Sequence, residues 1–163
     1  MEQWKPIIGF PGYSISDTGR VRNDDTGRVA TLSRNQTGLI YVGLMRGRQQ
    51  CKRGVAAMVA RAFLAPPLNE AFDTPIHLDG DPSNNRVENL MWRPRWFAFR
   101  YQMQFSNGRR GWTVPIRETH TGEEFPTSWD AAIKYGLIDR EIMQATINNT
   151  FVWPTYQVFK VIE

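Results

Sequence analysis

The stretch IHLDGDPSNNRVENLMW, residues 76–92, brings together the side chains of this chain that are best suited to chemistry. It holds His77, one of the two histidines in the sequence, followed by two aspartates and three asparagines. A neutral imidazole with a pKa near neutrality can take a proton from water. Carboxylate and carboxamide oxygens are the ligands that a hard cation such as Mg²⁺ prefers. The residue types therefore suggest a nuclease centre that activates water beside a metal ion, although Ile76, directly before the histidine, offers no oxygen.

The segments before this stretch must hold it in place. Residues 1–50 alternate glycine turns with short β-type runs such as YSIS, GRVRN and LIYVGLM. This pattern predicts a small antiparallel sheet of short strands. The run VAAMVARAFL, residues 55–64, predicts a helix that Pro66 and Pro67 bring to an end.

The stretch itself predicts a strand end at residues 76–78 and a turn at residues 79–80. A short helix through Val87 and Leu90 is expected next. Residues 93–105, RPRWFAFRYQMQF, mix arginine with aromatic side chains and fit neither the helical nor the strand period well. We interpret them as a connecting helix.

The last third of the chain opens with the β-like run WTVPIRE and a turn at Thr121 and Gly122. Ser128 can cap a helix WDAAIKY that Gly136 would close, and Asp139 can cap a second helix, REIMQATIN. Two short helices with a short turn are typical of a helix-turn-helix. The alternative is a helical packing unit or a protein contact.

Composition excludes several classes of protein. With 163 residues, 41% hydrophobic and 22% charged, the chain has the composition of a soluble folded protein. No apolar run approaches the roughly 20 residues that span a membrane, and the N-terminus lacks the pattern of a signal peptide. We expect no membrane partner and a cytoplasmic location in a bacterial host cell. Cys51, the single cysteine, forms no internal disulfide and makes a poor zinc site with two distant histidines. His120, beside a Thr-Gly turn, is expected at the surface.

The charge is unevenly distributed. Residues 1–112 hold sixteen Lys and Arg against nine Asp and Glu, a formal charge of +7, whereas residues 113–163 hold four against seven, a charge of −3. Arginine dominates the basic set, and its planar fork suits phosphate groups and base edges. The basic part predicts contact with double-stranded DNA, the alternative being a solvated basic face. The acidic part favours a protein partner. The candidate DNA-binding residues are Arg20, Arg22, Arg28, Arg34, Arg46, Arg48, Lys52, Arg53, Arg86, Arg93, Arg95 and Arg100.

Four segments together resemble a known family. The opening EQWKPIIGFPGYSISDTGRVRN is similar to the nuclease-associated modular motif at the front of phage and intron HNH homing endonucleases. VAAMVARAFL resembles the helix that follows that motif, and IHLDGDPSNNRVENLMW resembles the HNH core. TGEEFPTSWDAAIKYGLI resembles the helix-turn-helix repeat that often closes these proteins. The match covers nearly the whole chain in the order of the family.

The resemblance implies an α+β fold in three parts. Residues 1–50 would form the β-rich DNA-binding motif with its antiparallel sheet. Residues 51–105 would form the ββα-metal core and its connecting segment, and residues 113–163 the helix-turn-helix-like module. The family's core folds as two strands and a helix around one divalent ion, here Mg²⁺ if the centre is active and no cofactor otherwise. His77 corresponds to the family's general base and Asn89 to the asparagine that braces the core, while Asn84 and Asn85 fit the turn.

The chain departs from the family where the metal should bind. Ile76 stands in place of the usual aspartate or asparagine, Ala98 in place of a second asparagine, and Ala56 in place of a histidine. Asp79 or Asp81 can supply oxygen instead, and Asn107 can do so in a shifted register. The alternative for both aspartates is turn chemistry, and for His77 it is a structural role.

Three functions remain open from the sequence. The favoured one is a phage-encoded DNA-binding protein of the homing endonuclease type whose cleavage is weak or lost, because Ile76 and Ala98 occupy metal-ligand positions. The alternative is an active Mg²⁺-dependent endonuclease that nicks or cleaves specific DNA. A further alternative is a regulator that binds a phage or host protein.

Overall fold

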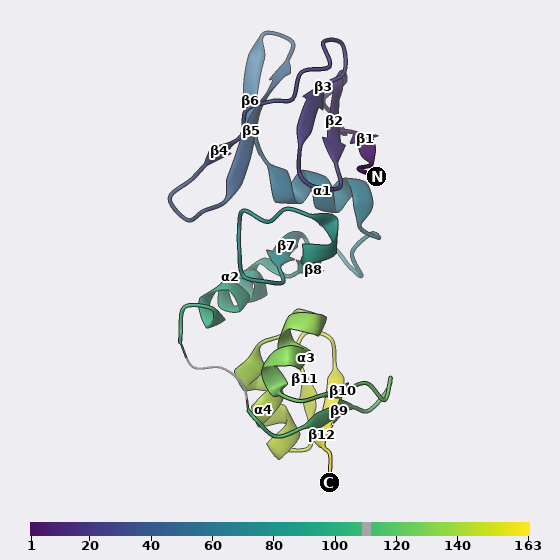
Figure 1. The fold of residues 1–163 in the computed structure, drawn as a ribbon, viewed down its shortest axis with the longest axis vertical. Helices are drawn as coiled ribbons and strands as arrows, with labels where there is room; N and C mark the ends of the chain where they lie inside the picture. The colour runs from purple at the N-terminus through teal and green to yellow at the C-terminus, as the bar shows by residue number, and fades with distance from the viewer. Residues whose placement is uncertain (109–111) are drawn as a thin grey trace. The chain divides into compact units, whose positions relative to one another are not determined.

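The computed structural model describes residues 1–108 and 112–163 and divides into two compact units, Met1–Arg95 and Trp96–Glu163. Each unit combines small antiparallel sheets with helices, and the described residues include four α-helices (Figure 1). The predicted α+β class is confirmed. No helix in the described ranges is long and apolar enough to cross a membrane.

Two three-stranded sheets form the first half of unit 1. The first contains β1 (Trp4–Pro6), β2 (Tyr13–Ser16) and β3 (Val21–Asn23), paired antiparallel in that order. The second contains β4 (Ser33–Arg34), β5 (Ile40–Arg46) and β6 (Gln49–Gly54). The sequence predicted one small sheet, whereas the glycine turns divide the strands between two, and β6 continues past residue 50 into the next helix.

Helix α1 (Val55–Phe63) closes the core of unit 1. Its buried residues recur at helical spacing and contact β2, β5 and β6, so one helix face covers both sheets. Val55 and Val59 are fully buried there, with Ile15 and Leu44 from the sheets. The helix ends one residue before the predicted boundary, just ahead of the two prolines.

The stretch that holds His77 forms a two-stranded sheet in unit 1. Strand β7 (Thr74–His77) pairs antiparallel with β8 (Leu90–Arg93), and His77 stands opposite Leu90. The predicted short helix through Val87 and Leu90 is wrong in its second half. Only Val87–Asn89 make one 3₁₀ turn, because Leu90 already pairs in the ladder. Helix α2 (Arg95–Gln104) follows β8 in the chain and confirms the predicted connecting helix.

Unit 2 packs helices against a four-stranded sheet. The sheet has the order β10 (Glu124–Phe125), β9 (Ile116–Glu118), β12 (Gln157–Val161) and β11 (Phe151–Val152). Helix α4 (Asp139–Ile147) contacts β11 and β12, and α3 (Ser128–Tyr135) contacts α4. The sequence predicted both helices but neither of the two C-terminal strands.

The helix ends in unit 2 differ in part from the prediction. Gly136 closes α3 in a left-handed conformation with φ of 61°, as expected. Thr127, not Ser128, caps α3 by accepting from the backbone N–H of Asp130. Ser128 is instead buried, and its hydroxyl donates to the Asp139 carboxylate at 2.5 Å. Asp139 therefore ties the start of α4 to the start of α3 rather than capping its own helix.

Candidate functional site

His77 is buried at the end of β7 and bonds to an asparagine of the loop that follows. Its Nε2 atom lies 2.8 Å from Oδ1 of Asn85, which is also buried. A carboxamide oxygen only accepts hydrogen bonds, so Nε2 carries the proton in this pair. The other ring nitrogen, Nδ1, is then the basic one. Sequence reasoning had placed Asn85 in the turn and missed its contact with His77.

Burial sets the charge of the His77 ring. The side chain is only 4% exposed, and this desolvation lowers the pKa of His77 below its ordinary value of 6.5. The hydrogen bond that the ring donates to Asn85 and the charges of Asp79 and Asp81 act in the opposite direction and are smaller. The imidazole is therefore neutral near pH 7, the state in which it can accept a proton.

Asn89 fastens the loop between β7 and β8. Its Oδ1 accepts from the backbone N–H of Asp79 at 3.0 Å. Its Nδ2 donates to Oδ1 of Asp79 and to the carbonyl of Asn84, both at 2.9 Å. The side chain is buried, so these bonds hold the loop in a single arrangement. This is the geometry of a bracing residue.

The two candidate metal ligands, Asp79 and Asp81, accept hydrogen bonds within the loop, Asp79 through both carboxylate oxygens and Asp81 through Oδ1. Asp79 also accepts from the N–H of Asp81 at 2.8 Å and from Nδ2 of Asn84 at 2.7 Å. Asp81 accepts from the N–H and the hydroxyl of Ser83 at 2.9 and 2.7 Å, and these bonds lower the pKa of Asp81. Such bonds are typical of aspartate turns.

The positions at which the resemblance implies polar side chains for the metal centre, residues 56, 76 and 98, carry hydrocarbon side chains. Ile76 is a buried hydrocarbon and Ala56 is buried in α1. Ala98 lies on α2 and Asn107 just beyond it, both in unit 2. In residues 1–108 and 112–163, no group of three or more His, Cys, Asp and Glu side chains is placed to hold a metal ion.

The β2–β3 turn supports the loop that carries Asn85. The N–H of Val87 donates to the carbonyl of Asp17 at 2.8 Å. Gly19 has φ of +89°, and a Cβ atom there would stand 2.9 Å from the Cβ of Asn85. Glycine is therefore required both for the turn and for the close approach. The sequence placed Gly19 among the glycine turns of residues 1–50 but gave no sign of its close approach to Asn85.

Five of the candidate DNA-binding residues form hydrogen bonds or ion pairs within the protein. Arg93 is buried and donates to the carbonyl of Trp92 at 2.7 Å, which removes it from the surface. The other four form ion pairs with neighbouring carboxylates and lose part of their charge. These pairs are Arg20–Glu2 at 2.9 Å, Arg22–Asp24 at 3.3 Å, Arg86–Glu88 at 2.8 Å, and Arg100–Glu141 in unit 2.

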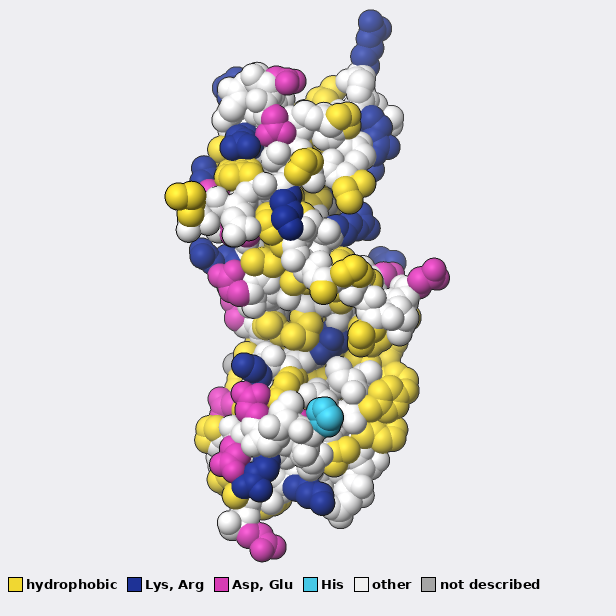
Figure 2. All heavy atoms as spheres, turned by 90° about the vertical axis from the view of Figure 1, so that its right-hand side faces the viewer, with side chains coloured by type: hydrophobic (Ala, Val, Ile, Leu, Met, Phe, Trp, Pro, Cys, Tyr) yellow, Lys and Arg dark blue, Asp and Glu magenta, His cyan; other side chains and the backbone are white. Residues whose placement is uncertain are grey.

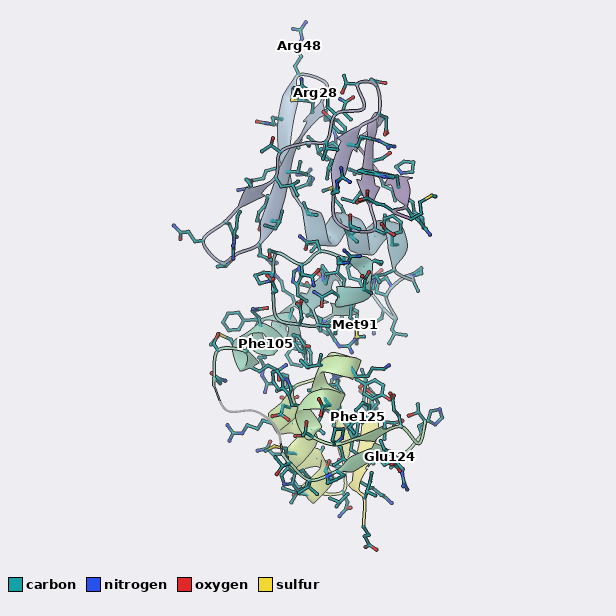
Figure 3. The ribbon with its side chains drawn as sticks, in the orientation of Figure 1. Arg28, Arg48, Met91, Phe105, Glu124 and Phe125 are labelled. Carbon is teal, nitrogen blue, oxygen red and sulfur yellow. The ribbon has the colours of Figure 1, made fainter. Side chains whose placement is uncertain are left out.

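Other basic side chains keep their charge available. Arg34 on β4, Arg48 at the tip of the β5–β6 hairpin and Lys52 on β6 are exposed, and none forms an ion pair among the described residues, although the charge of Arg34 acts on Asp81. Arg28 and Arg95 share these properties. Figure 3 shows Arg48 projecting beyond the hairpin, and Figure 2 shows Lys and Arg side chains spread over a face of unit 1.

The outer face of the second sheet has a particular composition. Val42 and Leu44 of β5 are buried, so by strand alternation Tyr41 and Gly43 face away from the core. Lys52 pairs with Gly43 and therefore shares that outer face, and its Nζ stands 4.6 Å from the Tyr41 ring centre. The outer face thus carries an aromatic ring beside an unpaired cation.

The comparisons with known proteins agree on the class of protein that this chain resembles. The NUMOD4 motif matches residues 2–45, which comprise β1 to β5 almost completely. The fold is similar to that of the HNH homing endonuclease I-HmuI, with a TM-score of 0.56, 20% identity and coverage of 98% of both chains. The chain therefore has the HNH homing endonuclease fold.

Curated relatives add sequence similarity. Two uncharacterized HNH endonucleases of Acanthamoeba polyphaga mimivirus are each 33% identical to this chain, over 90 and 94 residues. These segments cover 55% and 56% of this chain but only 26% and 23% of the relatives, so the chain spans about a quarter of their length. The resemblance to HNH homing endonucleases inferred from the sequence is confirmed.

Proposed function

We propose that this chain is a phage-encoded protein of the HNH homing endonuclease type that binds double-stranded DNA and has weak or lost cleavage activity. It would act in the cytoplasm of a bacterial host cell. The observation that carries the binding proposal is the set of exposed, unpaired basic side chains on the second sheet of unit 1. The similar protein I-HmuI binds and cleaves DNA, which supports the same class of ligand.

The second sheet suits a phosphate backbone. Arg48 and Lys52 lie on the β5–β6 hairpin, and two-stranded ribbons of this kind fit the major groove of B-DNA. Arg34 lies on the adjacent strand β4. The charges of Arg48 and Lys52 face solvent and form no ion pair within the described ranges. Each phosphate contact releases counterions, so such a surface gains affinity when the salt concentration is low.

Cleavage is proposed to be weak or lost because of what surrounds His77. The hydrocarbon of Ile76 replaces an oxygen ligand, and the oxygens of Asp79 accept three bonds from the loop. Ala98 has no lone pair to offer. Withdrawing Asp79 from the loop would leave its donors without partners, which opposes its recruitment as a ligand.

An active endonuclease is the second candidate, and one observation favours it. His77 remains neutral, with Nε2 held by Asn85 and Nδ1 left as a base, which is the state that proton abstraction requires. A regulator that binds a phage or host protein through the acidic residues 113–163 is the third candidate. The helix-turn-helix interpretation of α3 and α4 is likewise a proposal.

Titration of a labelled DNA duplex by fluorescence anisotropy tests the binding proposal. The logarithm of the affinity should fall with the logarithm of salt concentration by about 0.9 per phosphate contact. Arg48→Glu with Lys52→Glu should flatten this slope by about 2 and weaken binding at low salt. The matched control is Lys134→Glu with Lys160→Glu, the same charge change in unit 2. A flat salt response, or equal losses in both double variants, would contradict the proposal.

A further inference from the structure

A hollow of about 600 Å³ lies in unit 1, and neither His77 nor its loop lines it. Its floor is apolar, formed by the buried side chains of Ile7, Phe10 and Met58. Ile8 stands on its edge and is 85% exposed, which is unusual for an isoleucine that has no partner. Pro66 and Pro67, beyond the end of α1, form another wall.

Three arginines surround this apolar floor. Arg46 and Arg53 come from the β5–β6 hairpin, and Arg61 from the last turn of α1. The guanidinium carbons of Arg46 and Arg53 stand 4.6 and 5.2 Å from the centre of the Phe10 ring. Arg46 also donates through Nε to the carbonyl of Gly9 at 3.2 Å. Within the part of the chain that the structure describes, none of the three forms an ion pair.

These contacts fix the guanidinium groups of Arg46 and Arg53 without neutralising them. A guanidinium that stacks on an aromatic ring keeps its in-plane N–H donors free, and its fork matches the two oxygens of a carboxylate. The rim therefore holds cations in position for an acidic ligand. The apolar surface of the hollow, in contrast, contributes to binding only when an apolar group of the ligand covers it.

The arrangement disfavours nucleic acid as the occupant of the hollow. A stacked nucleobase needs an open aromatic face, but Phe10 is 3% exposed and lies beneath two guanidinium groups. A duplex backbone presents charge and no large apolar side chain, so it would leave the exposed apolar edge at Ile8 in contact with water. Acidic and apolar groups occur together in the side chains of a protein segment.

We propose that this groove binds a short segment of a protein partner in which acidic side chains flank large apolar ones. The apolar side chains enter the floor beside Ile7 and Met58, and the carboxylates pair with the arginine rim. This site differs from a partner site on the acidic residues 113–163, because it belongs to unit 1 and selects the opposite charge.

The neighbouring surface extends the groove. A second hollow of about 260 Å³ shares Leu64, Ala65, both prolines and Trp92 with the first. Leu68, on its edge, is 84% exposed. Contiguous apolar surface with a polar rim marks protein contact sites. Figure 2 shows hydrophobic side chains between dark blue cations on this unit. A bound segment of several residues can therefore follow the surface beyond the first hollow.

Panning a displayed library of random peptides against the full chain tests the proposal, with the Arg61→Glu variant used for counter-selection. Peptides that bind the unchanged chain alone should combine aspartate or glutamate with leucine, isoleucine or aromatic residues. Enrichment of peptides without an excess of acidic residues, or failure to enrich any peptide that depends on Arg61, would overturn the proposal.

A labelled copy of the best peptide then separates this site from the DNA surface. By fluorescence anisotropy, Arg61→Glu and Ile8→Ser should each weaken the peptide by about tenfold and leave duplex DNA affinity unchanged. Arg48→Glu should do the reverse. A peptide that ignores both groove variants, or that duplex DNA displaces competitively, would overturn the groove as a peptide site. Loss of DNA binding by Arg48→Glu concerns the proposed function only.

Discussion

The loop around His77 and the β5–β6 hairpin are both polar, yet they use their polar groups in opposite ways. In the loop, Asp79, Asn84 and Asn89 bind one another and the backbone, and Asp79 accepts from three donors of the loop. On the hairpin, Arg48 and Lys52 have no acidic partner among the described residues. The loop is complete within the fold, whereas the hairpin carries charge that an outside ligand can use.

This difference separates residues that maintain the fold from residues that meet a partner. A side chain whose bonds are satisfied inside the protein should affect stability when it is replaced. A side chain with an unsatisfied charge should affect binding and leave stability nearly unchanged. Replacing residues of the loop therefore tests this distinction between stability and binding, and the expected effects differ in size.

The largest effect should follow Asn89→Ala. Three hydrogen bonds disappear, and the buried loop donors and acceptors lose their partner, which should lower the free energy of unfolding by about 3 kcal/mol. Asn84→Ala, which removes one side-chain bond from a half-buried position, should cost about 1 kcal/mol. Urea denaturation of both variants measures the difference. Equal losses in the two variants would mean that the loop does not depend on Asn89 more than on Asn84.

Gly19→Ala should have the next largest effect. The added Cβ would stand 2.9 Å from the Cβ of Asn85 at a φ of +89°, so both the backbone and the contact resist it, at about 2 kcal/mol or more. Gly27→Ala is the matched control, since Gly27 has φ of +69° but no atom within 4 Å of an added Cβ. It should cost about 1 kcal/mol for the left-handed backbone alone. Thermal unfolding that ranks the two variants the other way would reject the contact between the β2–β3 turn and the loop.

The sequence supplied much of this picture because its signals are local. The helix over residues 55–64 has clear periodicity and two prolines at its end, and Gly136 marks the left-handed end of α3. The division into residues 1–50, 51–105 and 113–163 stays a prediction, as do the roles of the individual site residues. The compact unit Met1–Arg95 contains both the motif at the front and the strands of the core.

What the sequence could not supply depends on contacts between distant residues. Nothing local distinguishes Asn85 from Asn84, yet only Asn85 reaches His77, and its Cβ lies close to Gly19 of the β2–β3 turn. Phe10 gives no sign that Arg46 and Arg53 converge on it from a hairpin more than thirty residues away. The strands β11 and β12 are short. Pairing of β12 with β9, and of β11 with β12, stabilises them more than their own propensity does.

A smaller effect concerns pH. The pKa of His77 is lower in the folded protein than its ordinary value of 6.5, so the unfolded chain binds more protons below that pH. Stability should be constant above pH 6.5 and should fall as pH decreases below it, by at most about 1.4 kcal/mol per pH unit. His77→Gln should remove this part of the pH dependence. His120→Gln, at an exposed position as the sequence predicted, is the control and should leave it intact. Melting curves in which both variants retain the acid loss would show that His77 is not its source.

The smallest expected effect is DNA cleavage: the unchanged chain should produce little or no strand breakage. His77 is neutral and oriented, but a phosphodiester also requires stabilisation of the charge that builds up on its oxygens. Ile76 offers a hydrocarbon for this purpose, Ala98 a methyl group, and the carboxylate of Asp79 is held by the loop. Nicking of a supercoiled plasmid that carries the cognate region, with and without Mg²⁺ or Mn²⁺, measures the activity of the unchanged chain.

Two variants make this plasmid assay decisive. Ile76→Asp with Ala98→Asn restores two oxygen side chains, and if circular dichroism shows that it folds, it should nick more than the unchanged chain when the cation is present. His77→Ala then serves as the control for chemistry that depends on the imidazole. If the unchanged chain cuts robustly and His77→Ala abolishes the cutting, the loop must open to release Asp79 or Asp81. In that event the comparison between the hydrogen-bonded loop and the charged hairpin would fail at Asp79. Its carboxylate would leave its loop donors to bind an outside ligand as readily as the unpaired charges of Arg48 and Lys52 do.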